Sequence, residues 1–286
     1  MSECRLCPRD CGVDRSAAVG YCGCSDELRT AKYMLHFGEE PCISGTRGSG
    51  AVFFSGCNLR CAFCQNYPIS HDLKGENIDP AKLKEMIFGL KEKGAHNINF
   101  VTGTHYADKI AELLRDIKND LGIPVVYNCG GYEKTETLKM LEGLVDIYLP
   151  DMKYYSKDMS ARYSGARDYF EYALPALKEM LRQQPEAVFD NDGIMQRGVI
   201  VRHLVLPKGY HDSMKLLDVI AELSPRPLVS IMRQYTPCYD AKKYPEIDRR
   251  LTTFEYEKVT EHCADLGLEG FMQEKGCETL DMTPDF

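Results

Sequence analysis

Short apolar runs recur along the chain from residue 51 onward, each bounded by glycine, proline or polar residues. Ala51-Val52-Phe53-Phe54 is the first of them. Runs of this length and composition are typical of strands buried in a parallel sheet. The pattern therefore predicts six strands, at residues 51–54, 98–101, 124–127, 145–149, 198–205 and 227–232.

Longer amphipathic stretches separate these runs. Asp79-Pro80 predicts a helix start, because Asp is a good N-cap and Pro is tolerated in the first turn. We expect this helix to run to Gly94. Further helices are expected over residues 107–119, from 135, and over 157–182, 213–223 and 253–266.

Six successive β-α units predict an α/β protein with an all-parallel sheet and helices outside it. The sheet either curls into a partial barrel or stays open and doubly wound. In both arrangements the reactive groups are expected at the carboxyl ends of the strands.

Residues 1–48 differ from the rest because they are rich in Cys, Gly and Arg and show no sustained period. Such a segment buries too little apolar surface to fold by itself, so a metal or docking must order it. The expected domains are a Cys-rich metal-binding extension over 1–48 and a main domain over 49–286.

The overall composition narrows the class of protein. Hydrophobic residues make up 44% and charged residues 27%, as in soluble globular proteins. The net charge of −8 argues against nucleic-acid binding, which depends on clustered Lys and Arg. Neither a membrane span nor a secretory signal is visible, so we expect a cytoplasmic protein without a membrane partner.

The thirteen cysteines are unevenly spread, with nine of them in the first 64 residues. Cytoplasmic proteins seldom keep disulfides, so this density indicates metal binding or redox chemistry. Two metal sites are expected. Cys129, Cys263 and Cys277, which lie apart from the dense region, are interpreted as packing cysteines.

Cys57, Cys61 and Cys64 form the sharpest motif and directly follow the first predicted strand. Three thiolates at this spacing can hold one face of a four-iron cluster and leave the fourth iron without a protein ligand. A zinc site would need a fourth ligand, for which His71 is the local candidate.

This motif, with Phe63 at its aromatic position, resembles the radical S-adenosylmethionine (SAM) superfamily. More narrowly, the chain resembles the pyruvate formate-lyase activating enzymes and their homologues. The matching stretches are residues 4–15, 38–41, 53–57, 64–67, 101–105, 127–128, 148–154 and 202–207. The resemblance implies an α/β fold that is a partial (β/α)6 TIM-like barrel with a Cys-rich N-terminal extension.

The resemblance also implies the cofactors, a [4Fe-4S] cluster and SAM. In the superfamily the open iron chelates the methionine end of SAM, and reductive cleavage yields a 5'-deoxyadenosyl radical that abstracts hydrogen. The activating enzymes carry an Asp-x-Lys after the fourth strand, matched here by Asp151 and Lys153, and this Lys pairs with the SAM carboxylate. Arg202 is expected near the same group.

Other cofactor contacts carry over with changes. Gly103 and Thr104 stand where the activating enzymes use a Gly-Gly-Glu loop to hold the SAM amino group, and the Glu is absent. Asn128 replaces an Asp after the third strand. Gln234 and Tyr235 stand near the place of a His after the sixth strand. No catalytic residue is assigned.

The N-terminal cysteines Cys4, Cys7, Cys11 and Cys22 form the second expected metal site. A structural zinc with four thiolates is the preferred interpretation. A second iron–sulfur cluster that relays electrons is the alternative, because the spacing does not separate the two.

The leading hypothesis is a radical SAM enzyme that abstracts hydrogen from a protein or peptide, with activation of a glycyl radical enzyme as one version. By resemblance, a flavodoxin- or ferredoxin-type protein would donate the electron in an anaerobic setting. The alternative is a non-catalytic iron–sulfur or zinc protein for electron transfer or binding. A zinc-dependent nucleic-acid module is disfavoured by the acidic charge.

Overall fold

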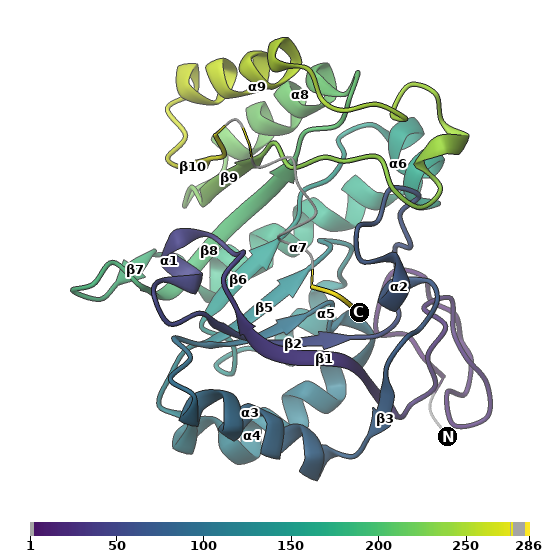
Figure 1. The fold of residues 1–286 in the computed structure, drawn as a ribbon, viewed down its shortest axis with the longest axis vertical. Helices are drawn as coiled ribbons and strands as arrows, with labels where there is room; N and C mark the ends of the chain where they lie inside the picture. Colours follow the sequence, from purple (N-terminus) through teal and green to yellow (C-terminus); the bar gives the residue numbers. More distant parts are fainter. Residues whose placement is uncertain (1–2, 275, 277–283) are drawn as a thin grey trace.

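The computed structural model describes residues 3–274, 276 and 284–286, so Cys277 lies outside the described residues. Across these residues the strands join one sheet in the order β10-β9-β8-β6-β5-β4-β2-β1-β3, with β7 paired to β8 beside this path (Figure 1). All six predicted strands are present. They are β2 (Ser49–Phe54), β4 (Ile98–Val101), β5 (Val125–Cys129), β6 (Ile147–Pro150), β8 (Met195–Leu204) and β9 (Leu228–Met232).

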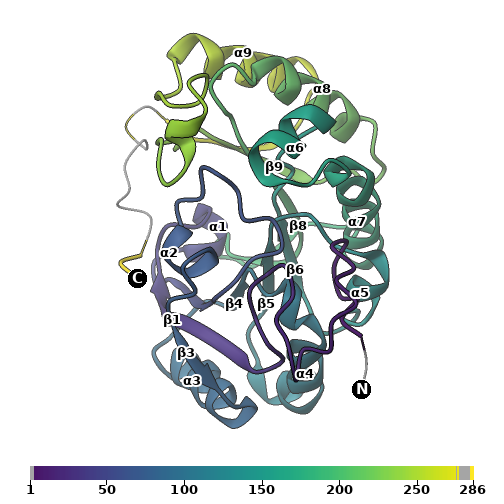
Figure 2. The same cartoon turned by 90° about the vertical axis from the view of Figure 1, so that its right-hand side faces the viewer.

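The six predicted strands are parallel to one another, so the parallel α/β architecture is confirmed; the additional strands β1, β3 and β7 pair antiparallel, so the sheet as a whole is mixed. Their side chains are mostly buried, as a sheet covered on both faces requires. Figure 2 shows the helices following one another in an arc around the sheet. Over the described ranges β3 and β10 stand at opposite ends of the strand order and do not pair with each other, which is the arrangement of a partial barrel.

Four strands were not predicted, and the longest is β1 (Leu28–His36), antiparallel to β2. No strand or helix was predicted in residues 1–48, because they show no sustained period, and the structure has both β1 and α1 (Pro41–Ser44) there. Most side chains of β1 are only partly buried, so the strand lacks the apolar run of its neighbours. The other three are β3 (Glu76–Ile78), β7 (Val188–Phe189) and β10 (Gly270–Met272).

The predicted helices are present, with one correction. The stretch 157–182 forms two helices rather than one, because Gly165 adopts a left-handed φ of 56° and ends the first. The Asp79 carboxylate caps α3 by accepting from the Lys82 backbone N–H at 2.7 Å. The helices are α3 (Pro80–Glu92), α4 (Ala107–Leu121), α5 (Thr135–Lys139), α6 (Lys157–Ser164), α7 (Tyr169–Gln183), α8 (Tyr210–Ala221) and α9 (Thr253–Asp265).

The N-terminal segment, residues 3–27, lies against the loops at the carboxyl ends of the first strands (Figure 2). The Arg9 side chain donates to the backbone carbonyls of Asn58 and Ser164. The Thr137 hydroxyl donates to the Leu6 carbonyl at 2.7 Å. Docking therefore orders this segment. The division of the chain into one domain over residues 1–48 and another over residues 49–286 stays a prediction.

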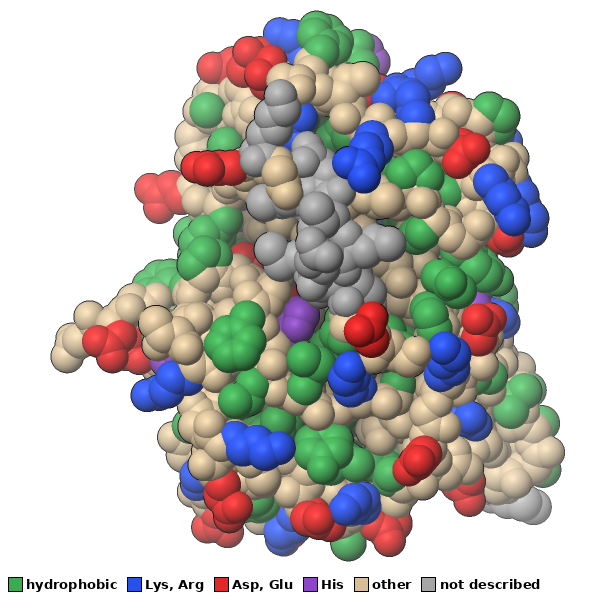
Figure 3. Space-filling model, in the orientation of Figure 1, with side chains coloured by type: hydrophobic (Ala, Val, Ile, Leu, Met, Phe, Trp, Pro, Cys, Tyr) green, Lys and Arg blue, Asp and Glu red, His purple; other side chains and the backbone are tan. Residues whose placement is uncertain are grey.

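The face of the molecule in Figure 3 carries side chains of both charges. On the face in Figure 3, acidic and basic side chains of the described residues are interspersed rather than gathered in one basic stripe. In the described part of the chain, no helix combines the length and the hydropathy that a membrane crossing requires.

Candidate functional site

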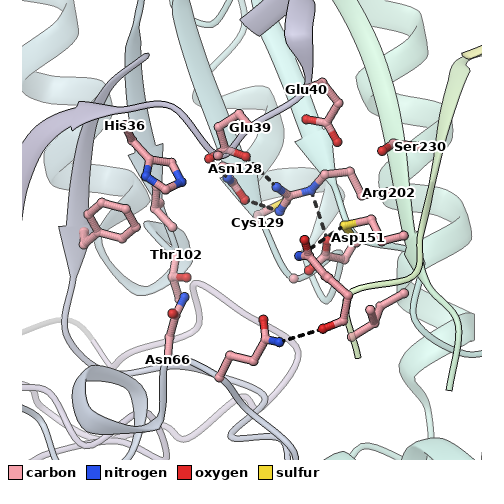
Figure 4. A pocket seen from close by; sticks show the side chains of 18 of the residues that line it. His36, Glu39, Glu40, Asn66, Thr102, Asn128, Cys129, Asp151, Arg202 and Ser230 are labelled. Atoms are coloured by element: carbon pink, nitrogen blue, oxygen red, sulfur yellow. Dashed lines mark hydrogen bonds and ion pairs between the residues drawn. The ribbon is translucent and has the colours of Figure 1, made fainter. Parts of the chain in front are cut away.

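A cavity of about 730 Å³ opens at the carboxyl ends of the parallel strands. The loops after β2 and β6 and the carboxyl ends of β5 and β8 contribute side chains to its wall, and Figure 4 shows several of them pointing into one space. The structure thus brings together residues that are far apart in the sequence. The predicted site residues in the lining are Cys57, Cys61, Cys64, Asn128, Asp151, Lys153 and Arg202.

The loop that carries the three cysteines begins at Gly56, whose φ of +86° favours glycine. A Cβ at this position would also clash with the Cys24 sulfur. The loop can therefore turn sharply out of β2 and lie close to the N-terminal segment. The turn places the three thiols in the wall of the cavity.

Each of the three sulfurs has a polar hydrogen near it. The Leu59 backbone N–H donates to Cys57 Sγ at 3.3 Å, and the Ser164 hydroxyl donates to Cys61 Sγ at 3.0 Å. Cys64 Sγ lies 3.2 Å from the Ser70 hydroxyl. Hydrogen bonds to the sulfurs of an iron–sulfur cluster are one means by which a protein sets its potential.

Burial shapes the chemistry of these thiols. It raises the pKa of Cys57, and it raises the pKa of Cys64 to about 12, with the neighbouring Cys61 thiolate adding to both shifts. Thiols of this kind become thiolates when a metal replaces the proton. Lys153 lies within electrostatic range of Cys57 and Cys61, so a cation stands beside the sulfurs.

Among the described residues, no three His, Cys, Asp or Glu side chains are placed to share one metal ion. A four-iron cluster makes a different demand, because each thiolate binds its own iron atom. The shared cavity, the donors to sulfur and the adjacent Lys153 fit such a cluster at Cys57, Cys61 and Cys64.

A row of paired charges crosses the floor of the cavity. Lys153 Nζ donates to Asp151 Oδ2 at 2.6 Å, and Asp151 Oδ1 lies 3.2 Å from Arg202 Nε. The second contact is an ion pair without the geometry of a hydrogen bond. Burial opposes the charge on Asp151, but the Lys153 and Arg202 cations together hold its pKa below the usual value.

Arg202 continues this row with its other nitrogens (Figure 4). One terminal nitrogen donates to Glu39 Oε2 at 2.9 Å and the other to Asn128 Oδ1 at 2.6 Å. The Asn128 amide in turn donates to Glu39 Oε1 at 3.0 Å. Asn128, Asp151 and Arg202 thus form one network across β5, β6 and β8, as their positions after successive strands suggested.

Tyr169, which sequence reasoning missed, fixes the loops on which this row is built. Its hydroxyl lies within hydrogen-bond distance of the Gly130 and Asp151 carbonyls and accepts from the Lys153 backbone N–H at 3.0 Å. Gly131, at a φ of +78°, leaves room for this contact, since a Cβ there would clash with the Asp151 carbonyl. Nothing local in the sequence signals the partnership.

Gly103 and Thr104 do not line the cavity, whereas their neighbour Thr102 does. The Thr104 hydroxyl instead donates to the buried Glu133 carboxyl at 2.6 Å. A Cβ on Gly103 would meet the Ile110 side chain at 2.6 Å, so this residue packs toward α4. Cofactor contacts at Gly103 and Thr104 stay a prediction.

Glu39 and Glu40 also line the cavity and had no predicted role. They come from the connection between β1 and α1. The stretch of residues 38–41 was one of those that carried the family resemblance, which is the signal that pointed to them.

Three of the four N-terminal cysteines lie near one another. The sulfurs of Cys11 and Cys22 are 3.4 and 3.8 Å from the position of a Cβ on Gly20. Burial raises the pKa of Cys7 to about 12, and Cys22 and Cys11 add to the shift. Cys4 is joined to this turn by its backbone N–H, which donates to the Val13 carbonyl at 2.8 Å. The metal of this site stays a prediction.

Comparisons with known proteins agree with the geometry. The sequence model of the Radical SAM superfamily matches residues 51–195, just over half of the chain. The chain is 34% identical to an uncharacterized protein of Methanocaldococcus jannaschii, over 91% of this chain and 74% of the relative. It is 26% identical to 3-methylornithine synthase of Methanosarcina acetivorans over 38% of this chain and 32% of that protein.

A solved structure shares the fold. The crystal structure of methylornithine synthase (PylB) aligns with a TM-score of 0.51 and 16% identity, covering 75% of this chain. The alignment spans 63% of the PylB chain, less than two thirds of its length. This similarity concerns the arrangement of the strands and helices.

Proposed function

The chain belongs to the radical SAM superfamily, and we propose that it reductively cleaves SAM and abstracts hydrogen from a protein or peptide substrate. The observation that carries the proposal is the single cavity shared by Cys57, Cys61 and Cys64 with the Lys153–Asp151–Arg202 row. Thiols for a cluster and charges for an amino-acid ligand therefore face the same space.

The residues of the cavity have separate tasks in this proposal. Cys57, Cys61 and Cys64 would hold a [4Fe-4S] cluster, which supplies an electron and an open coordination position when bound. Lys153 would pair with the SAM carboxylate. Asp151 holds the Lys153 ammonium in place through the 2.6 Å contact. An ammonium has three N–H donors, so Lys153 can donate to a carboxylate ligand and keep its hydrogen bond to Asp151.

Arg202 and Asn128 would orient the rest of the cofactor. Arg202 is fixed by three partners, so its guanidinium cannot move far to meet a ligand. Such a group selects ligands that fit its geometry rather than adapting to them. Tyr169 acts as a positioning residue, because it ties the loop of Lys153 to the loop of Gly130.

The partners follow from the same proposal. A cavity of about 730 Å³ is large enough for SAM together with a substrate group. A flavodoxin- or ferredoxin-type protein would supply the electron in the cytoplasm. Within the activating-enzyme branch the substrate would be a glycyl radical enzyme, and a neighbouring gene with a C-terminal glycyl-radical motif would support that version over peptide modification.

The N-terminal cysteines Cys4, Cys7, Cys11 and Cys22 would hold zinc or a second cluster. Replacing Cys57, Cys61 and Cys64 together and measuring the remaining metal separates the two: zinc without iron supports the structural site, and residual iron with sulfide supports an electron relay.

The proposed activity is tested by anaerobic reconstitution with iron and sulfide, reduction with dithionite, and measurement of 5'-deoxyadenosine formed from SAM. We expect Cys61→Ala to lose both cluster iron and cleavage. Cys263→Ala, which removes a buried thiol far along the chain at α9, is the matched control and should retain both. A reducible cluster that never cleaves SAM would instead support the non-catalytic electron carrier.

A further inference from the structure

The Glu40 carboxylate is buried in the wall of the cavity and lacks a full set of partners. Its relative exposure is 8%, and its Oε2 atom receives no hydrogen bond from any residue that the structure describes. Figure 4 shows it beside Arg202 and Ser230, directed into the open space. Although Glu40 is the N-cap residue of α1, its side chain does not cap that helix. The side chain therefore has no structural use for its second oxygen.

Side chains of the described part of the chain do not supply the missing donor to Oε2. The Arg202 guanidinium is already committed to Glu39, Asn128 and Asp151. Ser230 is the hydroxyl that interacts with the Glu40 carboxyl. A buried carboxylate oxygen without a donor costs free energy, which a ligand that brings an N–H group would recover.

The charge balance of the cavity points in the same direction. Among the described acidic and basic side chains that line it, three are carboxylates, Glu39, Glu40 and Asp151, and two are cations, Lys153 and Arg202. Burial raises the pKa of Glu40 against the pull of Arg202, and the nearby Glu39 raises it further. A cationic ligand beside Glu40 would keep it ionised and would balance the surplus carboxylate.

Glu40 stands at the end of the charged row that is farther from the cysteines. Lys153 is the member of the row that interacts electrostatically with the Cys57 and Cys61 thiols, and it is followed by Asp151 and then by Arg202. Glu40 lies beyond Arg202, next to Ser230 on β9. Phe271 and Met272 of β10 line the same cavity and add apolar surface.

We propose that Glu40 forms a substrate subsite that binds an ammonium or guanidinium group, such as that of a basic side chain on a protein or peptide. The apolar surface of Phe271 and Met272 suits the methylene chain behind such a group. That the bound molecule is a substrate rests on the proposed function. The inference adds the chemical class of the substrate group that is bound.

The experiment uses the reconstituted, SAM-loaded protein and two probes of equal length, n-butylammonium and n-butanol, followed by ligand-observed NMR titration. We expect the wild type to prefer the cation. Glu40→Gln, which keeps the shape of the side chain and removes its charge, should weaken cation binding at least about tenfold. Glu92→Gln, an exposed change on α3, is the matched control and should bind the cation as the wild type does.

Glu40 could bind either a cationic group of the substrate or the amino group of SAM, and a second measurement distinguishes the two. Formation of 5'-deoxyadenosine without substrate should stay within about twofold of wild type in Glu40→Gln, since the cofactor is held elsewhere. A matching loss of SAM binding in this variant would overturn the substrate assignment. So would wild-type binding that shows no preference for the cation, or cation binding that Glu40→Gln leaves unchanged.

A preference for n-butanol that survives in Glu40→Gln and disappears in Glu40→Ala would also overturn the proposal, because it would identify Glu40 as a neutral hydrogen-bonding acid. The proposed function is tested independently. A protein that never cleaves SAM but binds n-butylammonium through Glu40 would refute the enzyme activity and leave the cation site standing.

Discussion

Arg202 and Glu39 form an ion pair of 2.9 Å although they are 163 residues apart in the chain. Arg202 is in β8, and Glu39 lies between β1 and α1. Their side chains are only 14% and 7% exposed, so the pair is shielded from solvent. The pair joins the connection after β1 to β8, and both residues line the cavity. We therefore expect a change in either residue to affect both folding and ligand binding.

Replacing Arg202 by Ala is expected to lower the free energy of unfolding by about 3 kcal/mol, because the buried Glu39 carboxylate would lose its cation and Asp151 would keep only Lys153. Arg202→Lys should lose less, since it keeps the charge and loses the fork geometry. Urea denaturation under anaerobic conditions measures both. Arg167→Ala, at an exposed pair with Asp158, is the control and should change stability by less than about 1 kcal/mol.

Lys153→Ala is expected to weaken SAM binding by about tenfold or more while cluster iron stays at the wild-type level, because the variant removes the cation and no sulfur ligand. Equilibrium dialysis with the reconstituted protein measures the affinity, and iron analysis measures the cluster. Lys82→Ala, which removes an exposed ammonium on α3, should leave both unchanged. Undiminished affinity in Lys153→Ala would show that this ammonium does not hold the cofactor.

Arg9 is expected to hold the N-terminal segment on the cluster loop. Its side chain donates to Asn58 and Ser164 carbonyls at 2.7 and 2.9 Å, and its guanidinium lies 3.8 Å from the ring centre of Tyr21. Arg9→Ala should cost about 2 kcal/mol of docking free energy and speed amide exchange over residues 3–24.

Hydrogen–deuterium exchange of the apo and reconstituted proteins gives the measurement for Arg9. Arg5→Ala is the matched control, because Arg5 pairs with Glu3 at the exposed surface, where both side chains are 61% exposed. Equal exchange rates in the two variants would contradict the role of Arg9.

Acid should destabilise the protein through His203. Burial lowers its pKa to about 4, and its ring lies 2.6 Å from the Met152 carbonyl and 2.7 Å from the Ser213 hydroxyl. The unfolded chain takes up a proton near pH 6.5, whereas the folded chain resists until about pH 4. Stability contributed by the neutral ring is therefore present above pH 6.5 and falls as the pH drops through this window.

His203→Asn, which keeps a donor for the Met152 carbonyl, should flatten the dependence of the unfolding free energy on pH in that window. Urea denaturation at several pH values between 4 and 7 measures the slope. The control is His211→Gln at an exposed position on α8, and it should keep the wild-type slope. An unchanged slope in His203→Asn would assign the acid sensitivity to other groups.

Elements with a strong local pattern were predictable, and those held by distant contacts were not. The strand at residues 98–101 was visible because it is a short, mostly apolar run, and all four of its side chains are buried in the structure. β1 was missed because it lies near the edge of the sheet with half-exposed side chains. The predicted helix over 157–182 was split because Gly165 ends α6 in a conformation that a periodicity argument does not detect.

Parts of the cavity followed the same rule. Asp151 and Lys153 were found because they follow β6 directly, and Arg202 because it lies near the carboxyl end of β8, and such strand ends meet at one edge of a parallel sheet. Thr102 rather than Thr104 lines the cavity because the chain turns at a φ of +60° on leaving β4, which sends the next residues toward Glu133.

By itself the sequence determined the three-cysteine loop, the order of the β-α units and the superfamily, because spacing and periodicity are properties of neighbouring residues. Only the tertiary structure decided that Glu39 meets Arg202, that Tyr169 binds two loops, and that Glu40 lines the cavity with one oxygen that no described residue pairs. Those contacts join distant segments of the chain. Burial removes water from a charged group, so a folded structure is stable only when another group close in space replaces that water, and such a group can be far away along the chain.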